Sequence, residues 1–156
     1  MPARKLLLII SVFALALAAC GSGESAPTGS ADEIAQKVFA EAGVEPFGPT
    51  ASLESDEDLE FYLGSTNYPE FTDTAVVLPL INLDTRALYI LKVETADEAE
   101  EVLAQLEEDV DPNKLICVSF ALEDVIDDSR DYVVFMTINS DHDQRDALAE
   151  AFQAID

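Results

Sequence analysis

The chain has 156 residues, of which 49% are hydrophobic, and its 32 acidic side chains against 8 basic ones give a formal net charge of −24 at pH 7. This length and apolar fraction are typical of one globular domain with a core of its own. The negative charge excludes nucleic acid and anionic lipid head groups as partners of the surface, because Lys and Arg bind both.

The first 19 residues have the features of a secretory signal. Arg4 and Lys5 form a short positive start, and an uncharged apolar run extends from Leu6 to Ala19. The 14 residues of this run are too few for a bilayer-spanning helix, which needs about 20, but they suit the apolar region of a cleaved signal. We therefore expect residues 1–19 to be removed from the mature protein.

The apolar run ends on a cysteine, and Leu17-Ala18-Ala19-Cys20 resembles the lipobox of bacterial lipoproteins. The resemblance implies transfer of diacylglycerol to the Cys20 thiol, cleavage between Ala19 and Cys20, and often acylation of the new amino group. Two or three acyl chains anchor a protein stably in a bilayer. We therefore expect a lipid-anchored protein on the extracytoplasmic face of a cell membrane, inner or outer. An ordinary cleaved signal with a coincidental cysteine is the alternative.

The mature chain of residues 20–156 divides into a tether and one domain. Residues 20–29 are rich in Gly, Ser, Ala and Thr, which predicts a flexible tether, and residues 30–156 form the predicted domain. Without the two basic residues of the signal, 6 basic side chains (8 − 2) face 32 acidic ones, so that the formal charge becomes −26. Cys117 is then the one cysteine besides Cys20, and its apolar neighbours indicate a small buried hydrophobe.

Four segments combine a helix-start signal with an apolar period of 3.6 residues. Two of them begin with a capping box, in which a Ser or Thr and a Glu three residues later each bond the other's backbone. The predicted helices, with their cap residues, are 30–43 (Ser30 and Glu33), 55–64 (Ser55), 95–112 (Thr95 and Glu98) and 140–155 (Ser140 and Asp143).

Between the helices, runs of β-branched and aromatic residues predict strands. Pro79 belongs at an edge or a bulge, because proline donates no ladder hydrogen bond. The stretch Glu123–Arg130 is ambiguous: it is a loop, or Val125 and Ile126 join a strand that pairs with Tyr132–Ile138 across residues 127–130. The predicted strands are 74–81, 86–94, 115–122 and 131–139.

This order predicts an α+β fold, a small antiparallel sheet of about four strands with helices packed on one face (ββα-ββα preceded by two helices). The lipobox followed by "ADEIAQKV", "DEDLEFYLG", "VETADEAEEVLAQLEE" and "DYVVFMTINSD" is similar to an uncharacterised lipoprotein family of mainly Gram-positive bacteria, known as domain of unknown function 4358. The resemblance covers about residues 31–154. It implies a small α+β lipoprotein domain and brings no catalytic residues. The segment from Lys114 to Arg130 departs from it by being longer and more apolar.

The stretch "SDHDQRD" at 140–146 holds side chains of types that ligate metals, Asp141, Asp143 and Asp146 with His142. It fits a calcium loop of the EF-hand type poorly, because three of the six required positions carry unsuitable residues. The residues favour an ordinary helix N-terminus, with acids at the positive end of the helix dipole. The three aspartates are therefore weak metal candidates, and we expect no cofactor.

The residues show no catalytic constellation. His142 is the one histidine, it lies in a different segment from Cys117, and no G-x-S-x-G occurs. We expect a binding or scaffold module of the cell envelope rather than an enzyme, with the bilayer and an envelope protein as partners. One alternative is a weak binder of calcium or of a cationic ligand, through the acids of Glu54–Glu60 or Asp141–Asp146. A carboxylate-based envelope hydrolase is a more remote one.

Overall fold

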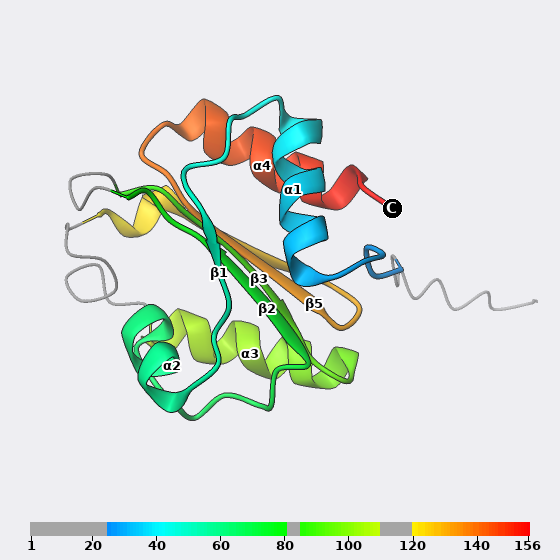
Figure 1. Ribbon diagram of the computed structural model, residues 1–156, viewed down its shortest axis with the longest axis vertical. Coiled ribbons are helices and arrows are strands. Elements are labelled where there is room, and N and C mark those ends of the chain that lie inside the picture. The colour runs from blue at the N-terminus through cyan, green and yellow to red at the C-terminus, as the bar shows by residue number, and fades with distance from the viewer. Residues whose placement is uncertain (1–24, 81–84, 110–119) are drawn as a thin grey trace, which may run out of the picture.

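The computed structural model describes residues 25–80, 85–109 and 120–156. The predicted α+β class is confirmed, because helices and an antiparallel sheet make up the described chain. Its elements, drawn in Figure 1, are α1 (Ala31–Ala42), β1 (Thr50–Ala51), α2 (Asp56–Leu63), β2 (Asp73–Val77), β3 (Ala87–Lys92), α3 (Ala96–Asp109), the 3₁₀ turn η1 (Leu122–Asp124), β4 (Val125–Arg130), β5 (Val133–Ile138) and α4 (His142–Ala154).

The five strands form one sheet in the order β1-β2-β3-β5-β4, and every neighbouring pair is antiparallel. β3 and β5 lie at its centre, and all of their residues except Lys92 are buried. A strand that is covered on both faces reads as a continuous apolar run, as "ALYIL" and "VVFMTI" do apart from one threonine. The hydroxyl of that residue, Thr137, donates to the carbonyl oxygen of Ala87 at 2.9 Å.

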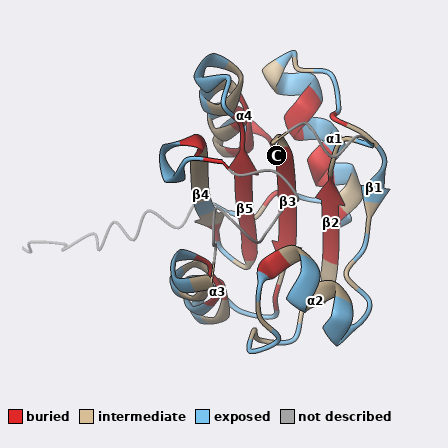
Figure 2. Cartoon of the chain, turned by 90° about the vertical axis from the view of Figure 1, so that its left-hand side faces the viewer, coloured by how far each residue is buried: buried red, intermediate tan, exposed pale blue. Residues whose placement is uncertain are grey.

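Helices cover both faces of the sheet, as Figures 1 and 2 show. α1 and α4 lie over Leu88 and Ile90 of β3, whereas α2 and α3 lie over Tyr89 and Leu91 of the same strand. The prediction of helices on one face is therefore wrong, because successive side chains of a strand point to opposite faces and both sets in β3 are apolar. The predicted strands 74–81, 86–94 and 131–139 correspond to β2, β3 and β5, and β4 and the short β1, which pairs with β2, complete the five-stranded sheet.

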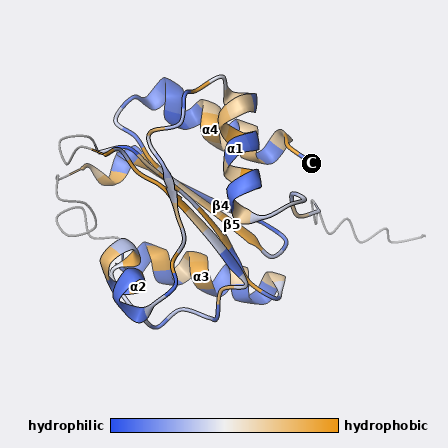
Figure 3. Ribbon diagram, in the orientation of Figure 1, coloured by the Kyte–Doolittle hydropathy of each residue, from blue (hydrophilic) through white to orange (hydrophobic). Residues whose placement is uncertain are grey.

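The helices are amphipathic, and in Figure 3 each of them carries hydrophilic as well as hydrophobic residues. Three of the four predicted start signals are confirmed. The hydroxyl of Ser30 accepts from the Glu33 N–H at 3.2 Å while the Glu33 carboxylate accepts from the Ser30 N–H at 2.9 Å. Thr95 and Glu98 make the same exchange at the start of α3, and Ser55 caps α2.

The predicted cap of α4 is wrong by one residue. Asp141, not Ser140 with Asp143, caps the helix: one carboxylate oxygen accepts from the backbone N–H of Gln144 at 3.2 Å and the other from the side-chain amide of Gln144 at 3.0 Å. A carboxylate that receives two donors satisfies the helix start better than the hydroxyl before it.

The ambiguous stretch before β5 is a strand. β4 pairs with β5 along its whole length, which confirms that Val125 and Ile126 belong to the strand. The turn lies at residues 131–132 and not at the predicted residues 127–130. Asp131 supports this position, because it has a φ of 52° and aspartate is among the few residues that adopt this left-handed conformation readily.

Two other predicted strand ends differ from the structure. β2 ends at Val77, so that Pro79 follows the strand and interrupts no ladder. Leu122 lies in η1 instead of a strand. Residues 115–119 of that predicted strand, and the predicted end of the third helix at Asp111-Pro112, lie outside the described residues.

The folded unit begins before residue 30. Pro27 is buried, and the guanidinium of Arg130 donates to the carbonyl oxygen of Ser25 at 2.9 Å. Residues 25–29 therefore belong to the domain, which corrects the second half of the predicted tether, 20–29. Their composition is typical of a linker, and the residues that hold them stand 63 and 105 positions away in the sequence.

Candidate functional site

The predicted lipid attachment site lies outside the described residues. Cys20, the cleavage position after Ala19, and Cys117 all belong to segments that the structure does not describe. Within the described ranges, no helix combines the length and the apolar character needed to span a bilayer. The lipid anchor at Cys20 therefore stays a prediction.

The three weak metal candidates at the start of α4 make separate interactions. Asp141 caps the helix, whereas Asp146 accepts from the neighbouring Arg145 guanidinium at 2.8 and 2.6 Å. Asp143 is exposed in the first turn. In the part of the chain that the structure describes, no group of three or more Asp, Glu, His or Cys side chains is arranged to hold a metal ion. The geometry therefore gives the calcium alternative no support.

An acid–histidine pair that the sequence analysis missed joins η1 to α4. His142 Nε2 lies 3.0 Å from Asp124 Oδ1, and the other oxygen of this carboxylate accepts from the Ala121 N–H at 3.0 Å. The hydrogen bond with His142 lowers the pKa of the Asp124 carboxyl, against the opposing effect of burial. The partners stand 18 positions apart, and η1 was not predicted, so no local pattern marked the pair. It holds the polar end of η1 on the first turn of α4.

The most distinctive concave surface lies at the start of α2, and we call it the α2 hollow. It has a volume of about 300 Å³. Three carboxylates and two aromatic rings distinguish it from the rest of the acidic surface. Its lining residues are Leu53, Glu54, Ser55, Asp56, Leu59, Thr66, Tyr68, Pro69, Glu70 and Phe71.

The aromatic wall of the α2 hollow is fixed in place. The rings of Tyr68 and Phe71 lie with their centroids 5.9 Å apart, and the Tyr68 hydroxyl donates to the carbonyl oxygen of Leu63 at 3.2 Å. Burial raises the pKa of Tyr68, and the charge of the Asp109 carboxylate adds to this effect. Tyr68 is therefore neutral at physiological pH and presents its ring as an apolar, cation-accepting surface.

The acidic wall contains carboxylates in two different roles. Asp58, beside the hollow, accepts from the Ser55 hydroxyl at 2.7 Å and from the Glu54 N–H at 3.1 Å. The bond from Ser55 lowers the pKa of Asp58, and the Glu54 N–H adds to this effect. Asp58 thus orders the helix start, whereas Glu54, Asp56 and Glu70 are exposed and line the hollow.

Two of the lining acids, Glu54 and Asp56, belong to the predicted acidic region Glu54–Glu60. Glu70 was missed, because it comes from the connection that leads back to the sheet. The stretch "YPEF" at 68–71, in which a carboxylate stands between two aromatic residues, is the local signal that could have identified Glu70. Exposed carboxylates beside aromatic rings are a setting that suits a cationic group, through charge attraction and cation–π contact.

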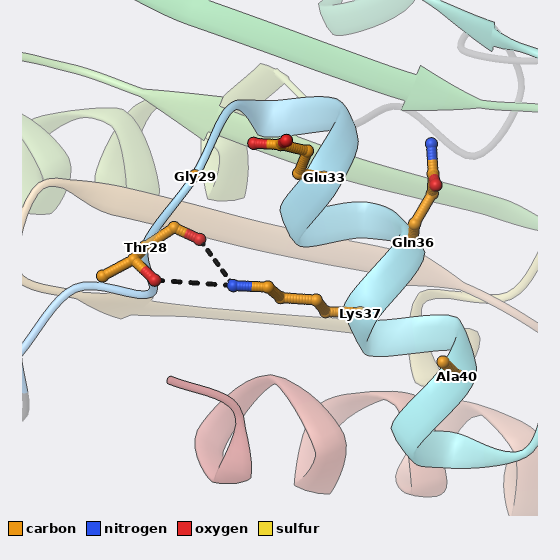
Figure 4. A pocket seen from close by; sticks show the side chains of 6 residues that line it. All are labelled: Thr28, Gly29, Glu33, Gln36, Lys37 and Ala40. Atoms are coloured by element: carbon orange, nitrogen blue, oxygen red, sulfur yellow. Dashed lines mark hydrogen bonds between the residues drawn. The ribbon is translucent and has the colours of Figure 1, made fainter.

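A wider groove runs along α1. It has a volume of about 610 Å³ and lies between α1 and the segment that precedes it, with Thr28, Gly29, Glu33, Gln36, Lys37 and Ala40 as its lining. Figure 4 shows the Lys37 side chain directed at Thr28. Its ammonium donates to the Thr28 carbonyl oxygen at 2.8 Å and to the main-chain oxygen of Asp156 at 3.0 Å. The one cation of this groove is thus engaged in joining chain segments.

A third recess bears on the hydrolase alternative, because it contains two carboxyl groups. Leu106, Glu107, Leu122, Val125 and Asp127 enclose about 200 Å³. Burial raises the pKa of Asp127, and the charges of Glu107 and Asp128 act in the same direction. The recess is smaller than the 300–1,000 Å³, roughly, of ligand pockets, and Glu107 is exposed. It gives a carboxylate hydrolase little support.

No protein-family model, curated protein or solved structure matches this chain. The resemblance to the lipoprotein family therefore stays a prediction from the sequence motifs.

Proposed function

We propose that the protein is a membrane-anchored extracytoplasmic lipoprotein whose domain is a binding module of the cell envelope. The lipobox-like stretch before Cys20 supports the anchor. The observation that carries the binding role is the α2 hollow, which places three exposed carboxylates beside two fixed aromatic rings.

The ligand of the α2 hollow is a cationic group, such as a lysine or arginine side chain of an envelope protein. A guanidinium or ammonium group pairs with Glu54, Asp56 or Glu70, while its alkyl stem and charge contact the rings of Tyr68 and Phe71. The volume of about 300 Å³ lies at the lower end of ligand pockets and accommodates a side chain better than a large cofactor. The formal charge of −26 adds long-range attraction for a cationic partner.

The affinity of one such contact is low. Exposed ion pairs contribute about 0.2–1 kcal/mol each, and salt screens them over about 8 Å at physiological ionic strength. Anchoring on the same membrane raises the effective concentration of the two partners, so that a weak contact suffices. Binding therefore weakens as the salt concentration rises.

The anchor is tested by following precursor processing in cells. Globomycin, which blocks the lipoprotein signal peptidase, and the substitution Cys20→Ala are both expected to leave a longer precursor, because cleavage between Ala19 and Cys20 does not take place. Unchanged processing in both experiments contradicts the anchor.

The ligand class is tested by calorimetric titration of the domain with an arginine-rich peptide. The double variant Glu54→Gln/Glu70→Gln is expected to bind about fivefold more weakly, the loss of two exposed ion pairs. The matched control is Glu100→Gln/Glu101→Gln, which removes two exposed carboxylates from α3 and tests the effect of net charge alone. An equal loss in the control, or no binding at low salt, contradicts the assignment.

A further inference from the structure

The segment before α1 is attached to the domain through a buried arginine. Arg130 is 7% exposed. Its guanidinium donates to the carbonyl oxygens of Phe152 and Ile155 at 2.8 and 2.6 Å, and to that of Ser25 at 2.9 Å. The first two acceptors lie at the C-terminal end of α4, where the helix dipole is negative and favours a cation. Arg130 therefore links Ser25 to the end of a core helix.

Two lysines from other elements hold the rest of this segment. Lys92, in the last position of β3, donates to the Gly29 carbonyl oxygen at 2.6 Å. Lys37 of α1 donates to the carbonyl oxygen of Thr28 and to the main-chain oxygen of Asp156, and the Thr28 hydroxyl donates to the same oxygen of Asp156 at 3.3 Å. Hydrogen bonds from charged donors are about twice as strong as neutral ones. Residues 25–29, which we call the docked segment, are thus fixed by cations from three elements.

The docked segment limits how far the domain can lie from its lipid. Cys20 stands five positions before Ser25, and an extended chain advances about 3.5 Å per residue, so the connection spans at most about 18 Å. β2 itself spans Asp73–Val77, and the chain from Thr72 to Leu80, eight residue steps, reaches at most about 26 Å when fully extended.

Thr72 lies at the same end of the sheet as the docked segment. Its N–H donates to the carbonyl oxygen of Lys92 at 2.7 Å, and Lys92 holds Gly29. Leu80 follows the other end of β2 and is 83% exposed. Figure 1 shows the first described residues, before α1, beside the C-terminus and the β4–β5 turn, away from η1. One end of the sheet is therefore tied to the anchor and the other is not.

We propose that the docked segment orients the domain on the membrane, with the end of the sheet at Thr72 against the lipid surface and the end at Leu80 away from it. This inference rests on the proposed lipid anchor at Cys20. The orientation comes from the short covalent connection and not from charge attraction. The near end carries the acids Glu94, Asp131 and Asp156, and its cations Lys37, Lys92 and Arg130 are engaged with carbonyl oxygens.

The test uses the full lipidated chain in phosphatidylcholine vesicles that contain an acceptor-labelled lipid. In a Cys117→Ala background, a donor fluorophore is placed on Thr72→Cys or on Leu80→Cys, both at exposed positions. Energy transfer to the lipid surface is expected to be at least about twofold greater from position 72, because the two positions lie beyond opposite ends of β2 and are up to about 26 Å apart along an extended chain. Equal transfer, or greater transfer from position 80, overturns the orientation.

A second variant tests whether the short connection between Cys20 and Ser25 causes the orientation. Ten Gly and Ser residues inserted between residues 24 and 25 leave every contact of the docked segment intact but lengthen the connection about threefold. The difference between the two labels is expected to shrink. An unchanged difference overturns the role of the connection.

Mass spectrometry of the same preparations distinguishes the two proposals. A chain without acyl groups on Cys20 contradicts the proposed anchor and the orientation together. A lipidated chain with equal transfer from both labels contradicts the orientation alone.

Discussion

Charged side chains have opposite roles in two regions of this acidic domain. At the docked segment, Arg130, Lys37 and Lys92, three of the 6 basic residues in 20–156 (8 − 2), donate to main-chain carbonyl oxygens of this segment. At the α2 hollow, exposed carboxylates line a recess with aromatic walls. The difference shows how the scarce cations fix one end of the fold and leave the acids of the other region available to a ligand.

The largest expected effect comes from Arg130→Met, which removes the cation but keeps much of the side-chain volume. The carbonyl oxygens of Ser25, Phe152 and Ile155 lose a charged donor, and we expect unfolding in urea to become easier by about 2–4 kcal/mol. Lys92→Met, the matched control, loses one exposed bond and is expected to lower the stability by about 1 kcal/mol or less. Equal losses would show that the burial of Arg130 does not increase its contribution to the free energy of unfolding.

A truncation pair tests whether residues 25–29 belong to the domain. A chain that begins at Ser30 lacks the buried Pro27 and the acceptors that residues 25–29 offer to the three cations, and we expect a loss of about 1–3 kcal/mol. A chain that begins at Ser25 retains these contacts and is expected to unfold in urea like the chain that begins at Cys20. Equal stability of the two truncated chains would mean that residues 25–29 are part of the tether and not of the domain.

A fall in pH should remove the contribution of Asp58 to stability but not that of Arg130. The folded-state pKa of Asp58, beside the α2 hollow, is lowered by the Ser55 hydroxyl. Its contribution to stability is present above the unfolded value of 3.8 and disappears as the pH falls through the lower folded value. The loss caused by Asp58→Asn is therefore expected at pH 6 and absent near pH 2, as measured by urea unfolding at both values.

The loss caused by Arg130→Met is the comparison for this pH dependence. Its contacts join a guanidinium to carbonyl oxygens and include no carboxyl group. We expect the same loss at pH 6 and pH 2. A loss that disappears in acid would mean that a carboxylate balances Arg130.

The smallest expected effect is a gain in stability. Tyr89 of β3 is fully buried in the core beneath α2 and α3, and its hydroxyl makes no hydrogen bond. Tyr89→Phe removes an unsatisfied polar group, so thermal unfolding should require about 0.5–1 kcal/mol more. Tyr132→Phe, at a partly exposed position, is the control and should change little. A loss at Tyr89 would reveal a partner for its hydroxyl.

The parts of the fold that were predicted correctly depend on residues close together in the sequence. The capping boxes at Ser30 and Thr95 join residues three positions apart, so the sequence contains both partners of each bond in one short stretch. The second layer of helices was missed although the continuous apolar run of β3 is typical of a strand covered on both faces, because the run does not indicate which helices lie on which face. β4 was missed in part because "VIDDSR" is an edge strand with polar residues.

The two regions compared here were predicted to different extents for the same reason. Glu54 and Asp56 were identified as acids with a binding role among the alternatives, but Glu70 joins them only through the fold. The docked segment was assigned to the tether, because Arg130 stands 105 positions from Ser25. Contacts of that separation depend on the sheet and leave no local pattern.

The most direct test of the binding role is amide chemical-shift mapping of the domain during titration with an arginine-rich peptide at low salt. We predict shifts that saturate at residues 53–59 and 66–71, around the α2 hollow, and that disappear as salt is added. Residues 25–29 should not respond, because the cations there are already engaged with carbonyl oxygens. Weak shifts spread evenly over all acidic surfaces, without saturation, would contradict a binding site at the α2 hollow.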